Sequence, residues 1–270
     1  MKNFGCFFVA ISIILLCACS DDTSDEQQER RSNANNIIGF EVLGISAKIN
    51  QQENVISVIV LDDTDLTTIT PTIIISESAS VSPASGVTQD FSNTLQYTVT
   101  AEDGTTQSYA VTINTLTFAF TIESKSYELI RRELDWDEAA DFAVQRGGKL
   151  AEINDLAENQ GVFNNVANNA NIVFENLEQE LVWLGGNDLE NEGVWILDGS
   201  NDGQGQQFWQ GGRDGMAVDG LFSNWGNIEP DGGTGQNNLA LILRNTPLND
   251  AAQWNDLNNI NNLYFVIEYD

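Results

Sequence analysis

The stretch "GNIEPDGGTGQNN", residues 226–238, gathers oxygen-bearing side chains in one loop. Glu229 and Asp231 flank Pro230, and a glycine-rich turn leads from them to three adjacent amides that end at Asn238. Glycines and a proline at this density predict a loop with a defined backbone conformation. No residue type that commonly serves as a catalytic base stands beside the two acids, which favours a set of ligands over an active site.

Acidic residues dominate the rest of the chain as well. The 270 residues carry 40 acidic and 11 basic side chains, a formal net charge of −29, and 41% of them are hydrophobic. This hydrophobic content is enough for one large or two ordinary domains. The charge disfavours nucleic acid and anionic membrane surfaces, and the lack of histidine removes the usual general base and the commonest transition-metal ligand. Cations are therefore the expected partners.

The N-terminus is predicted to be an export signal. Residues 1–19, "MKNFGCFFVAISIILLCAC", combine an early lysine with an apolar run too short for a comfortable membrane span. The three cysteines of the sequence, Cys6, Cys17 and Cys19, all lie in this segment, so no domain beyond it can form a disulfide or a thiolate metal site.

The end of this segment, "LCAC", resembles the bacterial lipobox, whose cysteine is lipidated and becomes the mature N-terminus. The resemblance implies a lipid anchor at Cys19, and an ordinary cleaved signal peptide is the alternative. Residues 20–36 are too polar to bury a core and are predicted to be a disordered acidic tether. The expected location is the outer membrane of a Gram-negative bacterium, with the protein exposed at the cell surface and in contact with the membrane only through its anchor.

Residues 37–116 alternate in short apolar bursts such as "VISVIVLDD" and "SYAVTI", rich in Val, Ile and Thr. Period-two alternation across residues 97–113, with Asp103-Gly104 in the middle, predicts a β-hairpin. We expect a compact antiparallel sandwich. The stretch resembles the Ig-like modules of bacterial surface lipoproteins, which implies a spacer; a second binding module is the alternative.

The periodicity changes after residue 118. "DWDEAADFAVQRGG" predicts a helix that is capped by Asp135 with Glu138 three residues later and is stopped by Gly147. A second helix is expected from about Asp155 to Ala170. The predicted inner faces of the two helices comprise Trp136, Ala139, Ala140 and Ala143 in the first, and Leu156, Phe163, Val166 and Ala170 in the second. Short strands among long loops follow, including "LVWLGGN", "GVWIL", "LALIL" and "YFVIEY".

Five motifs, taken in order, resemble the C-type lectin-like domain over residues 118–270. They are "WDEAADFAVQRGGKLAEIND", "VWLGGNDLENEGVWILDGS", "FSNWGNIEPDGGTGQNNLALI", "WNDL" and "YFVIEY". The fold class expected for the chain is therefore multidomain: an all-β Ig-like sandwich followed by an α+β C-type lectin-like domain. The family's usual disulfide positions hold Ala143 with Ile267 and Leu239 with Asn259, so this chain lacks those bridges.

The resemblance implies a Ca²⁺ site at the opening stretch, because Ca²⁺ prefers hard oxygen ligands and needs neither histidine nor cysteine. Carried over by position, its ligands are Glu229, Asp231, Asn237, Asn255 and Asp256. The same resemblance implies that sugar hydroxyls complete the coordination, and that Pro230 follows a cis peptide bond. The alternative is a polar loop without an ion.

Acid and amide are exchanged relative to a mannose-type site, which has asparagine after the proline and an acid at the position of Asn237. The sugar specificity does not follow from this pattern. A second Ca²⁺ site is implied by Asp188, Glu192 and Asn238, with a solvated acidic turn as the alternative.

The aromatic residues divide into core and contact candidates. Within the family motifs we expect core packing rather than sugar stacking for Trp183, Trp195, Trp225 and Trp254. Phe208 and Trp209 belong to the additional stretch at residues 201–222 and are the expected exposed ligand contacts, alongside Glu229, Asp231, Asn237 and Asn255.

The function expected from the sequence is that of a surface-tethered, calcium-dependent carbohydrate-binding protein that binds a glycan or a surface glycoprotein. A protein-binding module of the same fold, with Ca²⁺ structural or absent, is the second hypothesis. A glycoside hydrolase is a remote third, because the carboxylates cluster with amides as metal ligands do and no apolar surroundings are evident that would raise a pKa. The chain is thus predicted not to be an enzyme, and its oligomeric state is left open.

Overall fold

The computed structural model describes residues 31–169 and 180–270. The predicted signal segment with Cys19, most of the tether and Ala170 lie outside the described residues. Residue contacts group Ser32–Asp270 into one compact unit. Among the residues described, no helix is both long and apolar enough to cross a bilayer.

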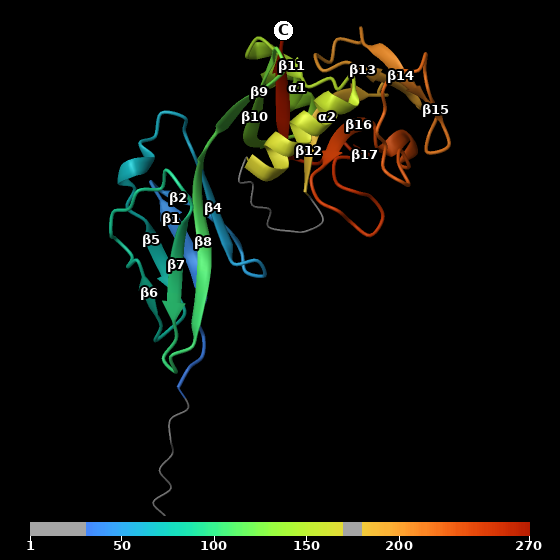
Figure 1. The fold of residues 1–270 in the computed structure, drawn as a ribbon. Coiled ribbons are helices and arrows are strands. Elements are labelled where there is room, and N and C mark those ends of the chain that lie inside the picture. Colours follow the sequence, from blue (N-terminus) through green and yellow to red (C-terminus); the bar gives the residue numbers. More distant parts are fainter. Residues whose placement is uncertain (1–30, 170–179) are drawn as a thin grey trace, which may run out of the picture. The chain divides into compact units, whose positions relative to one another are not determined.

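The N-terminal region, residues 37–115, consists of β-strands (Figure 1). Its strands are β1 (Ile37–Val42), β2 (Ile45–Ser46), β3 (Lys48–Asn50), β4 (Val55–Val60), β5 (Thr72–Ile75), β6 (Ser80–Ser82), β7 (Leu95–Thr100) and β8 (Thr106–Thr115). One 3₁₀ turn, Leu66–Thr68, is capped by Asp65.

Two sheets of this region share one hydrophobic core. One has the strand order β2-β1-β5 and the other β3-β4-β8-β7-β6. Phe40 of β1, Val58 of β4 and Tyr97 of β7 all lie in the same buried cluster, so the inner faces of both sheets contribute to it. The predicted all-β region with two packed sheets is confirmed; its assignment as Ig-like stays a prediction.

The predicted hairpin is confirmed, since β7 and β8 pair antiparallel around Gly104, whose φ is +90°. The expectation of a purely antiparallel sandwich is wrong, because β4 pairs parallel with β8. These two strands are far apart in the chain, and β5 of the other sheet, β6 and β7 lie between them in sequence, so no hairpin dictates their direction.

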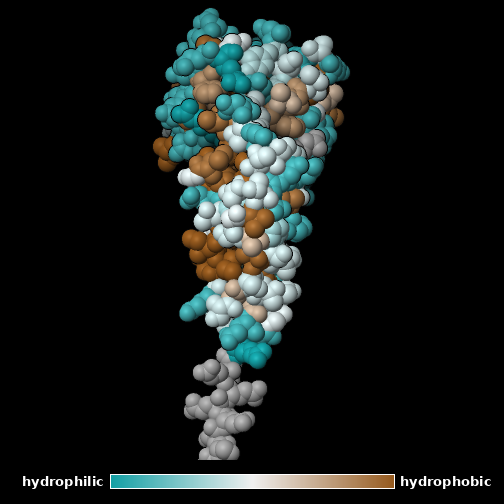
Figure 2. Space-filling view, turned by 90° about the vertical axis from the view of Figure 1, so that its left-hand side faces the viewer, coloured by the Kyte–Doolittle hydropathy of each residue, from teal (hydrophilic) through white to brown (hydrophobic). Residues whose placement is uncertain are grey.

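Apolar side chains also gather on the outer surface of the N-terminal region (Figure 2). Ile38 of β1 and Ile74 of β5 are exposed on paired strands of the three-stranded sheet. The strands therefore do not follow a strict pattern of apolar inside and polar outside.

The C-terminal region begins at β9 and contains the two α-helices of the described chain (Figure 1). Its strands are β9 (Thr117–Ile122), β10 (Lys125–Leu134), β11 (Lys149–Leu150), β12 (Leu181–Asn187), β13 (Val194–Leu197), β14 (Gln206–Gln210), β15 (Met216–Ala217), β16 (Asn238–Ile242), β17 (Trp254–Leu257) and β18 (Leu263–Tyr269). They join in one sheet with the main order β15-β14-β13-β12-β18-β10-β9, from which β16 and β17 branch at β12. The predicted strands of this region are confirmed.

Helix α1 (Trp136–Gln145) forms as predicted. Asp135 Oδ1 accepts a hydrogen bond of 2.8 Å from the Glu138 amide, and the four residues expected on the inner face are all buried. Gly147 follows with a φ of +89°, a conformation that glycine adopts without steric cost.

Helix α2 (Leu156–Phe163) differs from its prediction. It continues into a π-helical segment, Asn164–Asn169, and Leu156 is exposed rather than buried. Its inner face carries Asn159 instead, whose side-chain oxygen accepts a hydrogen bond of 2.7 Å from the Trp254 indole. A specific polar contact therefore outweighs the apolar periodicity.

Packing around α2 is close as well. A Cβ atom on Gly161 would come within 2.8 Å of Ile122 Cδ1, so the glycine lets the helix approach β9. Val162 and Val166 are buried in the same core cluster as strands β12 and β16. This packing supports the end of the sheet that carries the acidic loop.

Candidate functional site

The loop that carries Glu229 and Asp231 is held against strand β17. The two oxygens of the Asp256 carboxylate accept hydrogen bonds from the backbone amides of Asp231 (3.1 Å) and Gly232 (2.9 Å). The Glu229–Pro230 peptide bond is cis, as predicted. The loop backbone is thus anchored by the side chain of a residue on a strand of the sheet.

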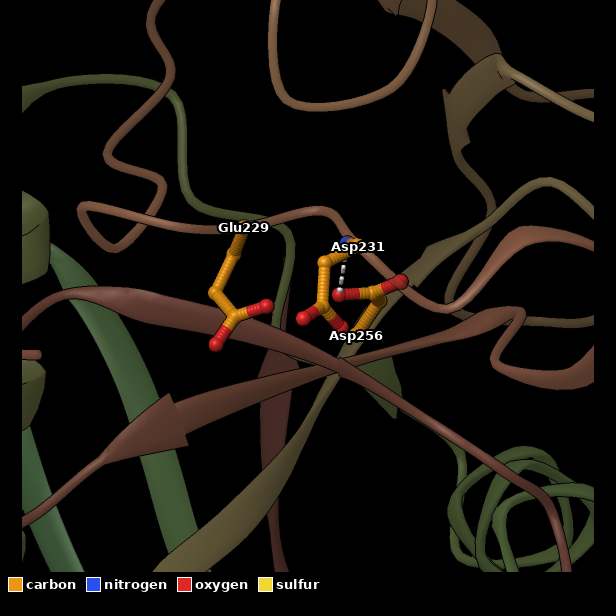
Figure 3. Close-up of side chains that lie close together, drawn as sticks. All are labelled: Glu229, Asp231 and Asp256. Carbon is orange, nitrogen blue, oxygen red and sulfur yellow. Dashed lines mark hydrogen bonds between the residues drawn. The ribbon is translucent and has the colours of Figure 1, made fainter. Parts of the chain in front are cut away.

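Three carboxylates meet beneath this loop. Glu229 and Asp231 hang from the loop, and Asp256 rises toward them from β17 (Figure 3). One oxygen of each lies within 4.8 Å of an oxygen of the other two. The structure therefore brings together the three acids of the predicted Ca²⁺ site.

The environment of these acids opposes their charge. Glu229 is 5% exposed and Asp256 is 1% exposed. The pKa of Glu229 is raised to about 7, mainly by burial and also by the charges of Asp231 and Asp256, against an opposing hydrogen bond from Asn249. Burial likewise raises the pKa of Asp256, although the two loop amides lower it.

No lysine or arginine in the described residues forms an ion pair with any of the three carboxylates. The expectation that no surroundings here raise a pKa is wrong, because the fold buries Glu229 without a basic partner. A cation would remove both the charge repulsion and the desolvation cost.

Further buried oxygens around the loop accept no hydrogen bond within the described structure. They are Glu229 Oε2, Asn249 Oδ1, Asn237 Oδ1, Asn238 Oδ1, Gln236 Oε1 and Asp188 Oδ1. A buried acceptor without a donor is unfavourable, and most buried polar atoms in proteins are paired. Oxygens of this kind are the ligands that Ca²⁺ coordinates, so the donor set fits the ion.

The two amides predicted as ligands, Asn237 and Asn255, lie at or next to the paired strands β16 and β17. Asn237 directly precedes β16, and its backbone oxygen accepts a 3.1 Å hydrogen bond from the amide of Asp188. Asn255 precedes Asp256 on β17 and is half-buried, opposite Ala240 of β16. Their coordination of an ion stays a prediction.

The residues of the predicted second site are divided. Asp188 and Asn238 are buried, and burial together with the charges of Glu192 and Asp256 raises the pKa of Asp188 to about 6, against a hydrogen bond from the Gly193 amide. Glu192 is exposed and lines a cleft of about 390 Å³ together with Asp231 and Asp256. The structure thus places Glu192 at the rim of the main site, and a second ion stays a prediction.

The predictions for the aromatic residues are confirmed in part. Trp183, Trp195 and Trp254 are buried as expected, and Trp225 is half-buried against the core cluster that contains Trp195 and Trp254. Phe208 is wrong as an exposed contact, since it is fully buried and its ring lies 6.1 Å from that of Trp225.

The alternation of side chains along strand β14 explains this error, because neighbouring residues on a strand point to opposite faces. Trp209 is half-buried, and its indole donates a 3.3 Å hydrogen bond to the Gly212 carbonyl. Trp209 thus keeps part of its surface exposed, and its contact with a ligand stays a prediction.

Asn249 is a site residue that the sequence did not indicate. Its side-chain amide donates a 2.7 Å hydrogen bond to Glu229 Oε1, and a Cβ atom on Gly226 would lie 2.4 Å from its oxygen. Asn249 stands in an ordinary polar loop with no distinguishing spacing, so only the fold reveals its contact with Glu229.

One comparison with known protein families matches the N-terminal region. Residues 37–113 match the family model described as "SGBP, N-terminal". No curated protein matches the sequence.

Among solved structures, the chain is similar to the mouse scavenger receptor C-type lectin carbohydrate-recognition domain, with 23% identity, coverage of 57% of this chain and 94% of that one, and a TM-score of 0.39. It is similar to the cow C-type carbohydrate-recognition domain of CD23 in the presence of a GlcNAc2Man3 oligosaccharide, with 21% identity, coverage of 57% and 92%, and a TM-score of 0.38. A calcium-independent type II antifreeze protein gives 19% identity, coverage of 56% and 89%, and a TM-score of 0.39.

Proposed function

We propose that the C-terminal region binds a carbohydrate through a Ca²⁺ ion held by Glu229, Asp231 and Asp256. The observation that carries this proposal is the meeting of three carboxylates within 4.8 Å of one another, two of them buried, with no basic partner in the described residues. The amides Asn237 and Asn255 are the proposed additional ligands. When bound, the ion would supply a positive centre that coordinates two neighbouring hydroxyls of a sugar.

The match of residues 37–113 to the SGBP family, a glycan-binding family, supports a carbohydrate as the ligand. The proposed organisation of the chain is a lipoprotein signal at residues 1–19, a tether at 20–36, a sandwich spacer at 37–116 and a C-type lectin-like domain at 118–270. In this arrangement the lipid anchor at Cys19 would hold the binding site at the surface of a Gram-negative outer membrane.

A glycoside hydrolase is the second function that the carboxylates raise, because Glu229 has a raised pKa and lies beside another acid. Its burial argues against this role. A general acid must reach the glycosidic oxygen, whereas Glu229 is 5% exposed and one of its oxygens is occupied by the amide of Asn249. A ligand of a bound cation needs no such access.

A protein-binding module is the other alternative, in which Ca²⁺ is structural or absent. The exchange of acid and amide at Asp231 and Asn237 is its main support. Binding of Ca²⁺ with no response to any glycan would favour this function over the proposed one.

The test is thermal unfolding of the protein in Ca²⁺ and in chelator. We expect Ca²⁺ to raise the melting temperature, because an ion at about 100 times its Kd stabilises the folded state by about 2.7 kcal/mol. Asp231→Asn is expected to remove most of this shift, because it removes a charged ligand of the ion. Asp231 is exposed, so the substitution should not disturb the core. A glycan array in Ca²⁺ then tests the ligand.

Asp250→Asn is the matched control, because Asp250 is an exposed aspartate outside the cluster and its substitution changes the net charge equally. Equal Ca²⁺ shifts in the wild type and Asp231→Asn would contradict the proposed site. No shift at millimolar Ca²⁺ would leave the three carboxylates as scaffold and make the protein-binding function the leading one.

A further inference from the structure

The additional stretch at residues 201–222 builds one wall of the cleft that contains the acids. Strands β14 and β15 form a hairpin whose turn, Gly211–Gly215, lines the cleft through Gly211, Gly212, Arg213 and Asp214. Opposite the turn lie Pro230, Asp231 and Asp256. The cleft of about 390 Å³ is therefore shared between the proposed Ca²⁺ site and the hairpin turn.

Close contacts between backbones fix the turn in this place. The amide of Gly211 donates a 2.7 Å hydrogen bond to the Gly193 carbonyl, and the amide of Gly193 donates one of 2.7 Å to Asp188 Oδ2. A Cβ atom on Gly215 would lie 2.3 Å from the Gln210 carbonyl, so only glycine fits at this point of the turn. The turn is thus tied to the same buried acid, Asp188, that lies behind the loop.

Arg213 is the basic residue of this wall, and its charge is poorly paired. In the described C-terminal region, Lys125, Arg146, Lys149 and Arg244 each have a carboxylate oxygen within 2.8 Å. Within residues 31–169 and 180–270, the one carboxylate paired with Arg213 is that of its neighbour Asp214, at 4.0 Å, and the side chain of Asp214 is 96% exposed. An exposed pair at this distance contributes little, so the guanidinium remains available.

We propose that Arg213 recognises an anionic substituent, a carboxylate or a sulfate, on a sugar whose hydroxyls bind at the neighbouring Ca²⁺ site. This inference rests on the proposed function and names its substrate class as acidic glycans. A guanidinium offers a planar pair of donors that matches both anions, and its position on the cleft wall lets one sugar reach both groups. Glu192 and Asp214 also line the cleft and would repel an anion. The anionic substituent is therefore expected to bind next to the guanidinium of Arg213, away from these two carboxylates.

The test compares four probes displayed on the same multivalent carrier: glucose, glucuronate, glucuronate methyl ester and glucose 6-sulfate. They share ring hydroxyls and differ in the substituent, and multivalent display compensates for weak single sites. Binding is measured in Ca²⁺ to the wild type, Arg213→Ala and Arg213→Lys. We expect the wild type to prefer an anionic probe over its neutral counterpart by about tenfold or more, since hydrogen bonds to charged groups are the stronger ones.

Arg213→Ala is expected to bring the ratio of anionic to neutral binding close to one, and Arg213→Lys to restore part of it, because lysine keeps the charge but not the paired donors. Arg132→Ala is the matched control, because Arg132 is an exposed arginine outside the cleft and its substitution removes the same charge. An advantage for glucuronate alone identifies a carboxylate as the ligand group, and one for glucose 6-sulfate alone identifies a sulfate; either supports the inference.

Equal binding of neutral and anionic probes, unchanged in Arg213→Ala, overturns the inference and leaves the Ca²⁺-dependent carbohydrate site intact. An equal fall of the ratio in Arg132→Ala also overturns it, because the effect would then come from net charge. A third outcome is that Ca²⁺ still raises the melting temperature but the protein binds neither the probes nor any glycan on an array. This outcome overturns the proposed carbohydrate function as well. The two failures are therefore distinguishable.

Discussion

Two groups of buried carboxylates in the C-terminal region differ in what balances their charge. Glu158 accepts hydrogen bonds from Lys125 Nζ (2.8 Å) and the Asn154 amide (2.7 Å), and also from the Tyr127 hydroxyl. Glu229 accepts only a neutral amide from Asn249, and its second oxygen accepts none in the described structure. The protein itself supplies hydrogen-bond donors and a positive charge to Glu158. Glu229 has no positive partner in the described structure, and one of its oxygens accepts no hydrogen bond there.

The pKa values record this difference. Burial raises the pKa of Glu158, but hydrogen bonds from Lys125, Tyr127 and Asn154 outweigh burial, and the net pKa is lowered. Burial raises the pKa of Glu229 to about 7. A buried acid with donors around it is therefore a structural element, whereas a buried acid that faces other acids is a group that a cation can stabilise.

The largest expected effect is on the structural acid. Glu158→Ala should lower the free energy of unfolding by about 2–4 kcal/mol, because the buried donors of Tyr127 and Asn154 lose their acceptor. Urea denaturation measures this loss. The control is Glu77→Ala, which changes an exposed glutamate in the loop after β5 and should alter stability by no more than about 0.5 kcal/mol. Equal losses in the two variants would show that Glu158 is not stabilising.

A change of opposite sign is expected at the other acid. In chelator at neutral or higher pH, Glu229→Gln should raise the free energy of unfolding by about 1–3 kcal/mol, since it removes a buried charge that has no basic partner. In Ca²⁺ the same variant should lose part of the stabilisation by the ion. Glu190→Gln, an exposed glutamate, controls for net charge. Destabilisation by Glu229→Gln in chelator would mean that the protein itself satisfies this acid.

The smallest expected effect is a change with pH. The folded-state pKa of Glu229, about 7, lies above its ordinary value of 4.5, so the folded state binds the proton more tightly and stability in chelator falls as pH rises through that interval. The difference in unfolding free energy between Glu229→Gln and the wild type should therefore widen by about 1–2 kcal/mol from about pH 5 to about pH 8. Comparing the two proteins cancels the titration of the other acids.

For Glu158 the sign reverses, because its folded-state pKa is lowered: its contribution is present above its ordinary value of 4.5 and is lost as pH falls below it. Urea denaturation of Glu158→Gln and the wild type from about pH 6 down to about pH 3 checks this behaviour, and the stability advantage of the wild type should shrink as the pH falls. If the difference in unfolding free energy between variant and wild type stayed constant with pH for both acids, the proposed contrast between Glu158 and Glu229 would be wrong.

Local sequence rules predict the elements that depend on neighbours in the chain. Helix α1 follows from Asp135 as its cap, its run of small apolar residues and Gly147 as its end, and the structure shows each of them in that role. The acids on either side of Pro230 and the pair at Asn255 and Asp256 are likewise visible as motifs. These signals lie within a few residues of one another, so local preferences are enough to indicate them.

The errors fall where partners are distant in the chain. Phe208 is buried because its strand turns it toward Trp225 and Trp254. On α2, Leu156 is exposed, whereas Asn159 faces inward and accepts a hydrogen bond from Trp254. The parallel pairing of β4 with β8 depends on the path of the chain through the other sheet. Each outcome is decided by a contact between segments that the sequence does not place together.

The sequence by itself determined the acidic character of the protein, its strand-rich first part, its capped first helix and the gathering of oxygen-bearing side chains in one loop, because composition, periodicity and short motifs carry that information. Only the tertiary structure decided which of those oxygens face one another. It brought Asp256 beneath Glu229 and Asp231, set Asn249 against Glu229, and placed Arg213 on the same cleft. The burial of those acids, and the absence of a basic partner for them within the described part of the chain, are products of long-range packing that determine the chemistry of this loop.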